Sequence, residues 1–113
     1  MEYKFKAIAL MRITQIVDSW PAPNRNMMKA LNALASKVEL TEEDKAAIGW
    51  RPSTDGRTIL FQADVEVAKE LDEHDVEMLS TMVEDPPERL VWTRADRVLQ
   101  AAIFEPLGVA PWL

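Results

Sequence analysis

The stretch "ADVEVAKELDEHDVEMLSTMV", residues 63–83, passes from one periodicity to another. Its first nine residues, 63–71, largely alternate apolar and charged side chains, which predicts a β-strand, although this composition would also tolerate a helix. The residues that follow place apolar side chains three and four positions apart, which predicts a helix from Asp72 to about Val83. A strand that runs directly into an amphipathic helix indicates an α+β domain.

The turn between these two elements, "LDEHD" at 71–75, has the residues of a helix cap. An Asp or Thr at the N-cap accepts a hydrogen bond from a free backbone N–H, and an acidic residue three positions later completes a capping box. The same outline recurs in "LTEED" at 40–44 and in "WTRAD" at 92–96. We predict that these turns start three helices, with the caps Thr41, Asp72 and Thr93. No metal site is expected in them, because consecutive acidic residues at a helix start point in different directions.

The N-terminal third predicts two helices separated by a break. Apolar residues recur at helical spacing over 4–20 and again over 25–38. The stretch "WPAPN" at 20–24 interrupts the pattern because proline cannot continue a helix, and Asn24 can cap the second helix. Two amphipathic helices joined by a short link favour a packed helical hairpin.

A short helix is expected after Thr41, ending near Gly49, and a β-hairpin after it. In "IGWRPSTDGRTILFQ", residues 48–62, the dipeptide Asp55-Gly56 predicts a tight turn before a stretch rich in β-formers. Pro52 should lie at a strand end or an edge. The sheet is then either this hairpin alone or three strands, if 63–71 pairs with it.

The C-terminal quarter should form one more helix and a tail. The breaker "EDPPER" at 84–89 should end the preceding helix, and a last helix is expected from Thr93 to about Phe104. Two prolines and a glycine predict an irregular tail over 105–113. We expect one helix-dominated α+β domain over 1–113, without an internal boundary.

Composition excludes several classes of protein. The chain has no cysteine, so disulfides and thiolate metal sites are absent, which suits a reducing cytosol. The apolar run from Ala7 to Met11 is short and is broken by Arg12, so neither a secretory leader nor a membrane span is expected. These features predict a soluble, cytoplasmic protein.

The charge is distributed unevenly along the chain. Residues 39–88 hold 15 acidic and 4 basic residues, a net charge of −11, whereas the rest holds 4 acidic and 9 basic residues, a net charge of +5. Such a segment attracts basic surfaces and repels nucleic acid, or it only keeps the protein in solution. The residues that we expect to contact a basic protein partner are Glu42, Glu43, Asp44, Glu70, Glu73 and Asp75. Trp112 is added as an aromatic anchor, unless it packs back onto the domain.

Catalysis is not expected. His74 is the single histidine, and it lies in a charge-rich helix start without a recognisable nucleophile motif nearby. Only three glycines are present, and they form no phosphate-binding loop. We therefore expect no enzyme activity, no cofactor and no metal.

Nucleic-acid binding is the alternative hypothesis. Three helices followed by a hairpin have the element order of a winged helix, but the helix after Thr41 would face phosphates with acidic residues. Basic residues on the N-terminal helices or the hairpin would have to make the contacts. This set is Lys4, Lys6, Arg12, Arg25, Lys29, Lys37, Arg51 and Arg57.

The order of the motifs also carries a resemblance. "NMMKALNALASKVELTEEDKAAIGW", a short hairpin, "VAKELDEHDVEMLSTMV" and a closing helix follow one another over residues 25–104. This order resembles a group of small phage and prophage proteins of unknown function, in which a "kv-L-t-EE" turn precedes a hairpin and an "e-L-d-e" helix start. The resemblance implies a viral source and a role in host interaction or virion production, and it supplies no catalytic residues.

Together these observations predict a small, non-enzymatic, phage-type interaction protein that binds a host or phage macromolecule through its acidic surface. In the sharpest form it is an anti-CRISPR or other anti-defence inhibitor, whose carboxylates occupy a basic groove that normally holds nucleic acid. Alternatives are the winged-helix-like regulator and a phage assembly factor that forms a defined oligomer. The oligomeric state stays open.

Overall fold

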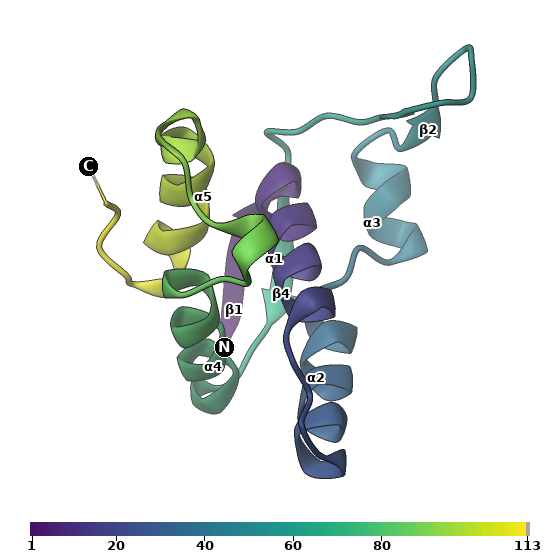
Figure 1. Ribbon diagram of the computed structural model, residues 1–113. Helices are drawn as coiled ribbons and strands as arrows, with labels where there is room; N and C mark the ends of the chain where they lie inside the picture. The colour runs from purple at the N-terminus through teal and green to yellow at the C-terminus, as the bar shows by residue number, and fades with distance from the viewer. Residues whose placement is uncertain (113) are drawn as a thin grey trace.

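The computed structural model describes residues 1–112, and over these residues the chain forms five α-helices and two small antiparallel sheets (Figure 1). The α+β class is confirmed. The helices are α1 (Ala7–Ser19), α2 (Arg25–Val38), α3 (Glu42–Ala47), α4 (Glu73–Glu84) and α5 (Arg97–Leu107). The strands are β1 (Glu2–Lys6), β2 (Arg51–Pro52), β3 (Ile59–Leu60) and β4 (Glu66–Glu70), and two 3₁₀ turns, η1 (Glu88–Leu90) and η2 (Arg94–Asp96), precede α5.

The first residues form a strand, and the helix that we predicted over 4–20 is wrong at its start. β1 pairs with β4 in antiparallel register, with Phe5 opposite Val67, and α1 begins only at Ala7. Residues 2–6 alternate exposed and inward side chains as a strand requires, yet the same apolar residues also match helical spacing, so the local pattern was ambiguous. A partner strand more than 60 positions away decides between the two.

β4 confirms the strand predicted within 63–71, but its partner is not the hairpin. Val67 and Lys69 are buried on the inner face, and the alternate residues Glu66, Ala68 and Glu70 are exposed. The hairpin strands β2 and β3 pair only with each other, so the structure has two separate two-stranded sheets in place of one three-stranded sheet.

The core is built around α1, which packs against α2, α4 and α5 while the β1–β4 sheet lies along another side (Figure 1). Leu10, Ile13 and Ile16 of α1 are almost completely buried, as are Phe5 of β1 and Phe104 of α5. Burying one such side chain stabilises the fold by about 1.5–3 kcal/mol. The predicted contact between the first two helices is confirmed, and Asn24 caps α2 by accepting the N–H of Met27.

The hairpin extends away from this core (Figure 1). Its strands are two residues each, shorter than predicted. Pro52 is the last residue of β2, so its predicted place at a strand end is confirmed. Gly56 turns the chain with φ at 69°, in the left-handed region that glycine adopts at low cost. At the base of the hairpin the rings of Trp50 and Phe61 stack with centroids 5.6 Å apart.

The last helix runs further than predicted. α5 continues to Leu107, so the irregular segment begins at Gly108 and not at residue 105. Pro106 lies in the final turn of α5, where proline costs one backbone hydrogen bond. Burial of Leu107, the residue after it, offsets this loss. Residue 113 lies outside the described residues, so the tail is described only to Trp112.

Candidate functional site

In all three predicted capping turns the second acidic residue accepts the backbone N–H of the cap. The turns at Thr41 and Asp72 start α3 and α4, but the turn at Thr93 starts the 3₁₀ turn η2, so the last helix begins at Arg97 and not after Thr93. Thr41 and Asp72 accept the N–H groups of Asp44 and Asp75, and the two aspartates accept the N–H groups of their caps in return. In the third turn, Oδ2 of Asp96 accepts both the backbone N–H and the hydroxyl of Thr93, at 3.0 Å each. These carboxylates therefore serve the helix starts.

Each of these three aspartates also meets a basic residue from a distant element. Lys69 of β4 lies 2.7 Å from Asp44, and Lys37 of α2 lies 2.7 Å from Asp75. Arg12 of α1 lies 3.5 Å from Asp96. The capping aspartates thus bind three helix starts to the rest of the fold, which the local capping motif does not require.

The pKa values of the capping carboxylates reflect these contacts. For Asp44, burial alone would raise the pKa, but hydrogen bonds from Lys69 and Thr41 outweigh it and hold the pKa below its ordinary value. Hydrogen bonds from the backbone N–H and hydroxyl of Thr93 lower the pKa of Asp96. All three helix starts thus favour ionised carboxylates, since the pKa of Asp72 is also lowered, chiefly by the backbone N–H of Asp75.

The expected acidic contact set divides into two groups. Asp44 and Asp75 are occupied by caps and lysines, and Asp75 is buried. Glu42, Glu43, Glu70 and Glu73 are exposed, on α3, β4 and the start of α4. Glu70 binds the N-terminal ammonium at 2.7 Å and Glu42 lies 3.7 Å from Lys45, whereas Glu43 and Glu73 have no ion pair within residues 1–112.

The exposed side of α4 extends this acidic set. Glu73, Glu77 and Glu84 are exposed, and their spacing of four and seven residues places them along one helix face. No ion pair to any of the three occurs in the described part of the chain. We call Glu73, Glu77 and Glu84 the α4 acidic face.

The basic residues expected to form a patch on the N-terminal helices lie on three elements, β1, α1 and α2. Lys4 and Lys6 lie on β1, and Lys6 is 3.6 Å from Asp64. Arg12 forms an ion pair with Asp96, and Lys37 forms one with Asp75. The exposed members that remain on α2 are Arg25 and Lys29, and Arg51 and Arg57 lie on the hairpin.

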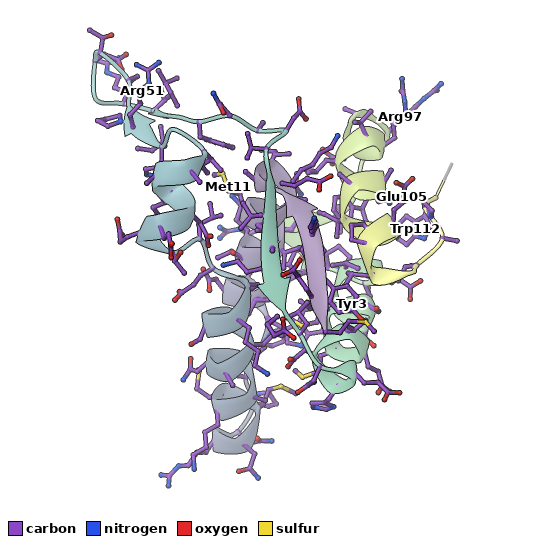
Figure 2. The ribbon with its side chains drawn as sticks, turned by 180° about the vertical axis from the view of Figure 1, so that it is seen from behind. Tyr3, Met11, Arg51, Arg97, Glu105 and Trp112 are labelled. Atoms are coloured by element: carbon purple, nitrogen blue, oxygen red, sulfur yellow. The ribbon has the colours of Figure 1, made fainter. Side chains whose placement is uncertain are left out.

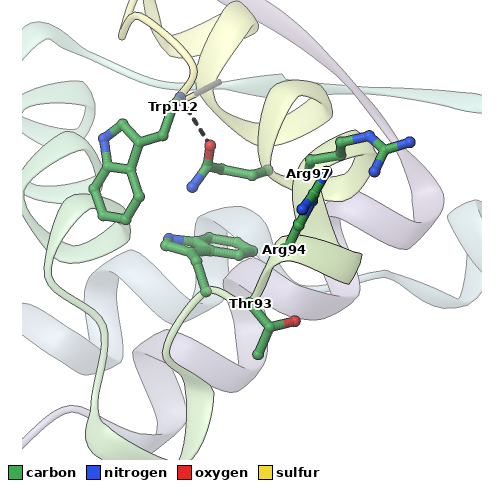
Figure 3. A pocket seen from close by; sticks show the side chains of 6 residues that line it. Thr93, Arg94, Arg97 and Trp112 are labelled. Atoms are coloured by element: carbon green, nitrogen blue, oxygen red, sulfur yellow. Dashed lines mark hydrogen bonds between the residues drawn. The ribbon is translucent and has the colours of Figure 1, made fainter.

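A cleft beside the start of α5 has a volume of about 640 Å³. Figure 3 shows Trp112 on one side of it and Arg94 and Arg97 on the other. Its lining consists of Trp92, Thr93, Arg94, Arg97, Gln100 and Trp112. We call it the Arg–Trp cleft. Of these residues, we had expected only Trp112 to contact a partner; the spacing of Arg94 and Arg97, three residues apart, was the available signal for the cleft.

Trp112 folds back onto the domain, although it keeps 49% of its surface exposed. Its backbone N–H donates to Oε1 of Gln100 at 2.9 Å (Figure 3). Its ring meets that of Phe104 edge-to-face, with the centroids 5.7 Å apart. The packing alternative for Trp112 is therefore the one observed, and the ring still has a free side toward the cleft.

Within residues 1–112 there is no group of three His, Asp or Glu side chains arranged to hold a metal ion. His74 is exposed in the first turn of α4. None of the helices described combines the length and the apolar character that a membrane crossing requires.

No protein family, curated protein or solved structure matches this chain. The geometry and chemistry of its own surface therefore carry the functional argument.

Proposed function

We propose that the protein is a non-enzymatic interaction protein that binds a basic protein surface, with the α4 acidic face at the centre of the contact. The supporting observation is that Glu73 and Glu77, four residues apart, are exposed like charges without ion pairs in the described structure. Glu73 lies in the first turn of α4, where its charge favours the helix dipole. Glu77 lies beyond that turn and faces a like charge four residues away, which destabilises a helix by about 0.2–0.5 kcal/mol, and Glu84 lies at the negative end of the dipole, so helix formation does not account for Glu77 and Glu84.

Exposed carboxylates of this kind suit recognition. Charged groups at the rim of an interface accelerate association and select partners more than they add affinity. Asp44 and Asp75 are left out of the proposed contact, since both are committed to caps and lysines. Glu42 and Glu43 on α3 provide a second, smaller acidic group. With the phage resemblance, the sharpest form of the proposal is an inhibitor, anti-CRISPR proteins included, that occupies a nucleic-acid groove.

The test is capture of binding proteins from a bacterial lysate by the immobilised chain and by a charge-reversed variant. Glu73→Lys, Glu77→Lys and Glu84→Lys together should abolish capture of the specific partner. A control with the same change in net charge, Asp18→Lys, Glu88→Lys and Glu105→Lys, should retain it. Raising NaCl from about 50 to about 500 mM should weaken the wild-type complex, because exposed charges are screened. Equal capture by both variants would contradict the proposal.

A second candidate is nucleic-acid binding through the hairpin, which one observation favours. The hairpin projects from the body and carries exposed Arg51 and Arg57, and Figure 2 shows Arg51 well away from Arg97 and Trp112. Ile59 and Leu60 are exposed on the same hairpin. Fluorescence anisotropy with labelled DNA and RNA at low salt tests this candidate: binding that Arg51→Gln with Arg57→Gln removes would support it, and no binding would discard it.

A further inference from the structure

The Arg–Trp cleft is lined by hydrogen-bond donors. Arg94 and Arg97 are exposed guanidinium groups, and neither has an ion pair within residues 1–112. The indole N–H of Trp112 donates to no atom of the described chain. The lining thus offers several donors that the fold does not use.

The amide oxygen in the cleft and the carboxylate beside it are already occupied. Oε1 of Gln100 accepts the backbone N–H of Trp112. Gln100 is only 3% exposed, and the –NH₂ group of its amide has no hydrogen-bond partner in the described chain. Beside the cleft, Asp96 is taken by Thr93 and Arg12. A lining with free donors and occupied acceptors selects an anion.

The aromatic residues of the cleft add a preference for a planar group. Trp112 is half exposed; Gln100 accepts its backbone N–H, and its ring packs edge-to-face against Phe104. Trp92 is fixed by a hydrogen bond of 2.7 Å from its indole N–H to the carbonyl of Val83 and by Arg12 at 5.3 Å from its ring. Ordered indole rings favour stacking with a planar base, because little side-chain freedom is lost on binding.

Size and charge decide between a small anion and a polyanion. A cavity of about 640 Å³ lies within the range of small-ligand sites. The chain carries a net charge of −6, which repels an extended nucleic acid at long range. Two arginines act within a screening length of about 8–10 Å, so a compact dianion is attracted locally.

From this geometry we infer that the Arg–Trp cleft binds a nucleoside monophosphate, with the phosphate at Arg94 and Arg97 and the base against Trp112. Forked guanidinium groups bind phosphate and carboxylate oxygens in pairs, but a phosphate offers three terminal oxygens and a double negative charge to two arginines, whereas a carboxylate offers two oxygens and a single charge. This site is separate from the α4 acidic face, so it does not depend on the function proposed above.

The test follows the four indole N–H signals in proton–nitrogen NMR spectra during titration with AMP, with Trp112→Phe used to assign one signal. AMP should shift the Trp92 and Trp112 signals in a saturable way and leave those of Trp20 and Trp50 unchanged. Adenosine, which lacks the phosphate, and inorganic phosphate, which lacks the base, should each bind at least tenfold more weakly than AMP.

Arginine variants complete the test. Arg94→Gln with Arg97→Gln should weaken AMP binding at least tenfold while backbone signals elsewhere stay in place. Arg51→Gln with Arg57→Gln removes the same charge from the hairpin and should change nothing. The inference is overturned if AMP at 10 mM shifts neither cleft signal, if the Arg94/Arg97 variant binds as wild type does, or if an acidic peptide such as hexaglutamate competes more strongly than AMP.

Discussion

Lys69 of β4 donates a hydrogen bond of 2.7 Å to Oδ2 of Asp44, the oxygen that also accepts the backbone N–H of Thr41. The ammonium group donates as well to the backbone carbonyl of Glu39, and the Lys69 side chain is only 7% exposed. One carboxylate oxygen therefore caps α3 and neutralises a buried lysine. This contact ties α3 to the sheet at a point where α3 itself has no buried side chain.

Asp44→Ala should destabilise the protein by about 3 kcal/mol, because it leaves the buried ammonium of Lys69 without its counter-ion. The measurement is urea unfolding followed by circular dichroism. Glu43→Ala, at the exposed neighbouring position, is the control and should change the free energy of unfolding by less than about 0.5 kcal/mol. A similar small loss for both variants would mean that Lys69 is solvated in a way the structure does not show.

The two lysine pairs should differ in strength. Lys37 contacts Asp75 at the same 2.7 Å, but the Lys37 side chain is 40% exposed. Lys37→Ala should therefore lower the free energy of unfolding only slightly, because water reaches this ammonium group. Lys69→Ala should cost clearly more in the same unfolding experiment, since it removes a buried stem as well as the charge. If both variants lost the same free energy of unfolding, burial of the lysine would not determine the strength of the pair.

Acid should weaken the fold through the capping carboxylates. The pKa values of Asp44, Asp72 and Asp96 lie below their ordinary value of 3.8, so the folded state binds fewer protons than the unfolded state in this range. Their contribution is complete well above 3.8 and is lost as pH falls through the lowered pKa values. The difference in free energy of unfolding between wild type and Asp44→Asn should accordingly stay constant above about pH 5 and narrow as the pH falls below about 4.

Phe5→Ala should destabilise the protein by about 3–5 kcal/mol, because Phe5 is fully buried where β1 meets the core. Lys4→Ala, on the outer face of the same strand, should cost less than about 0.5 kcal/mol. Hydrogen exchange offers an independent check, since the β1 amides bonded to β4 should be protected. If Phe5 and Lys4 gave equal losses and those amides exchanged freely, the β1–β4 pairing would be refuted.

Several features were predictable from the sequence because their interactions are local. The helix starts at Thr41, Asp72 and Thr93 depend on hydrogen bonds that span three residues, and Asn24 uses the same contact. The turn at Asp55-Gly56 and the strand before Asp72 likewise follow from neighbouring residues. Short-range contacts of this kind need little loop closure, so the local pattern largely determines them.

The tertiary structure decided the features that join distant residues. Residues 2–6 became a strand because β4 presented a matching edge, although their apolar spacing also fits a helix. In the same way, the carboxylates that are paired within the fold are those that contact Lys69, Lys37 and Arg12, which belong to distant elements.

The sequence by itself determined the caps, the breaks and the α+β class, since these rest on residues a few positions apart. The tertiary structure alone decided which carboxylates stay free and brought Trp112 to Arg94 and Arg97. The physical reason is that charge pairing and cavity lining depend on distances in space, which the folding of the core sets.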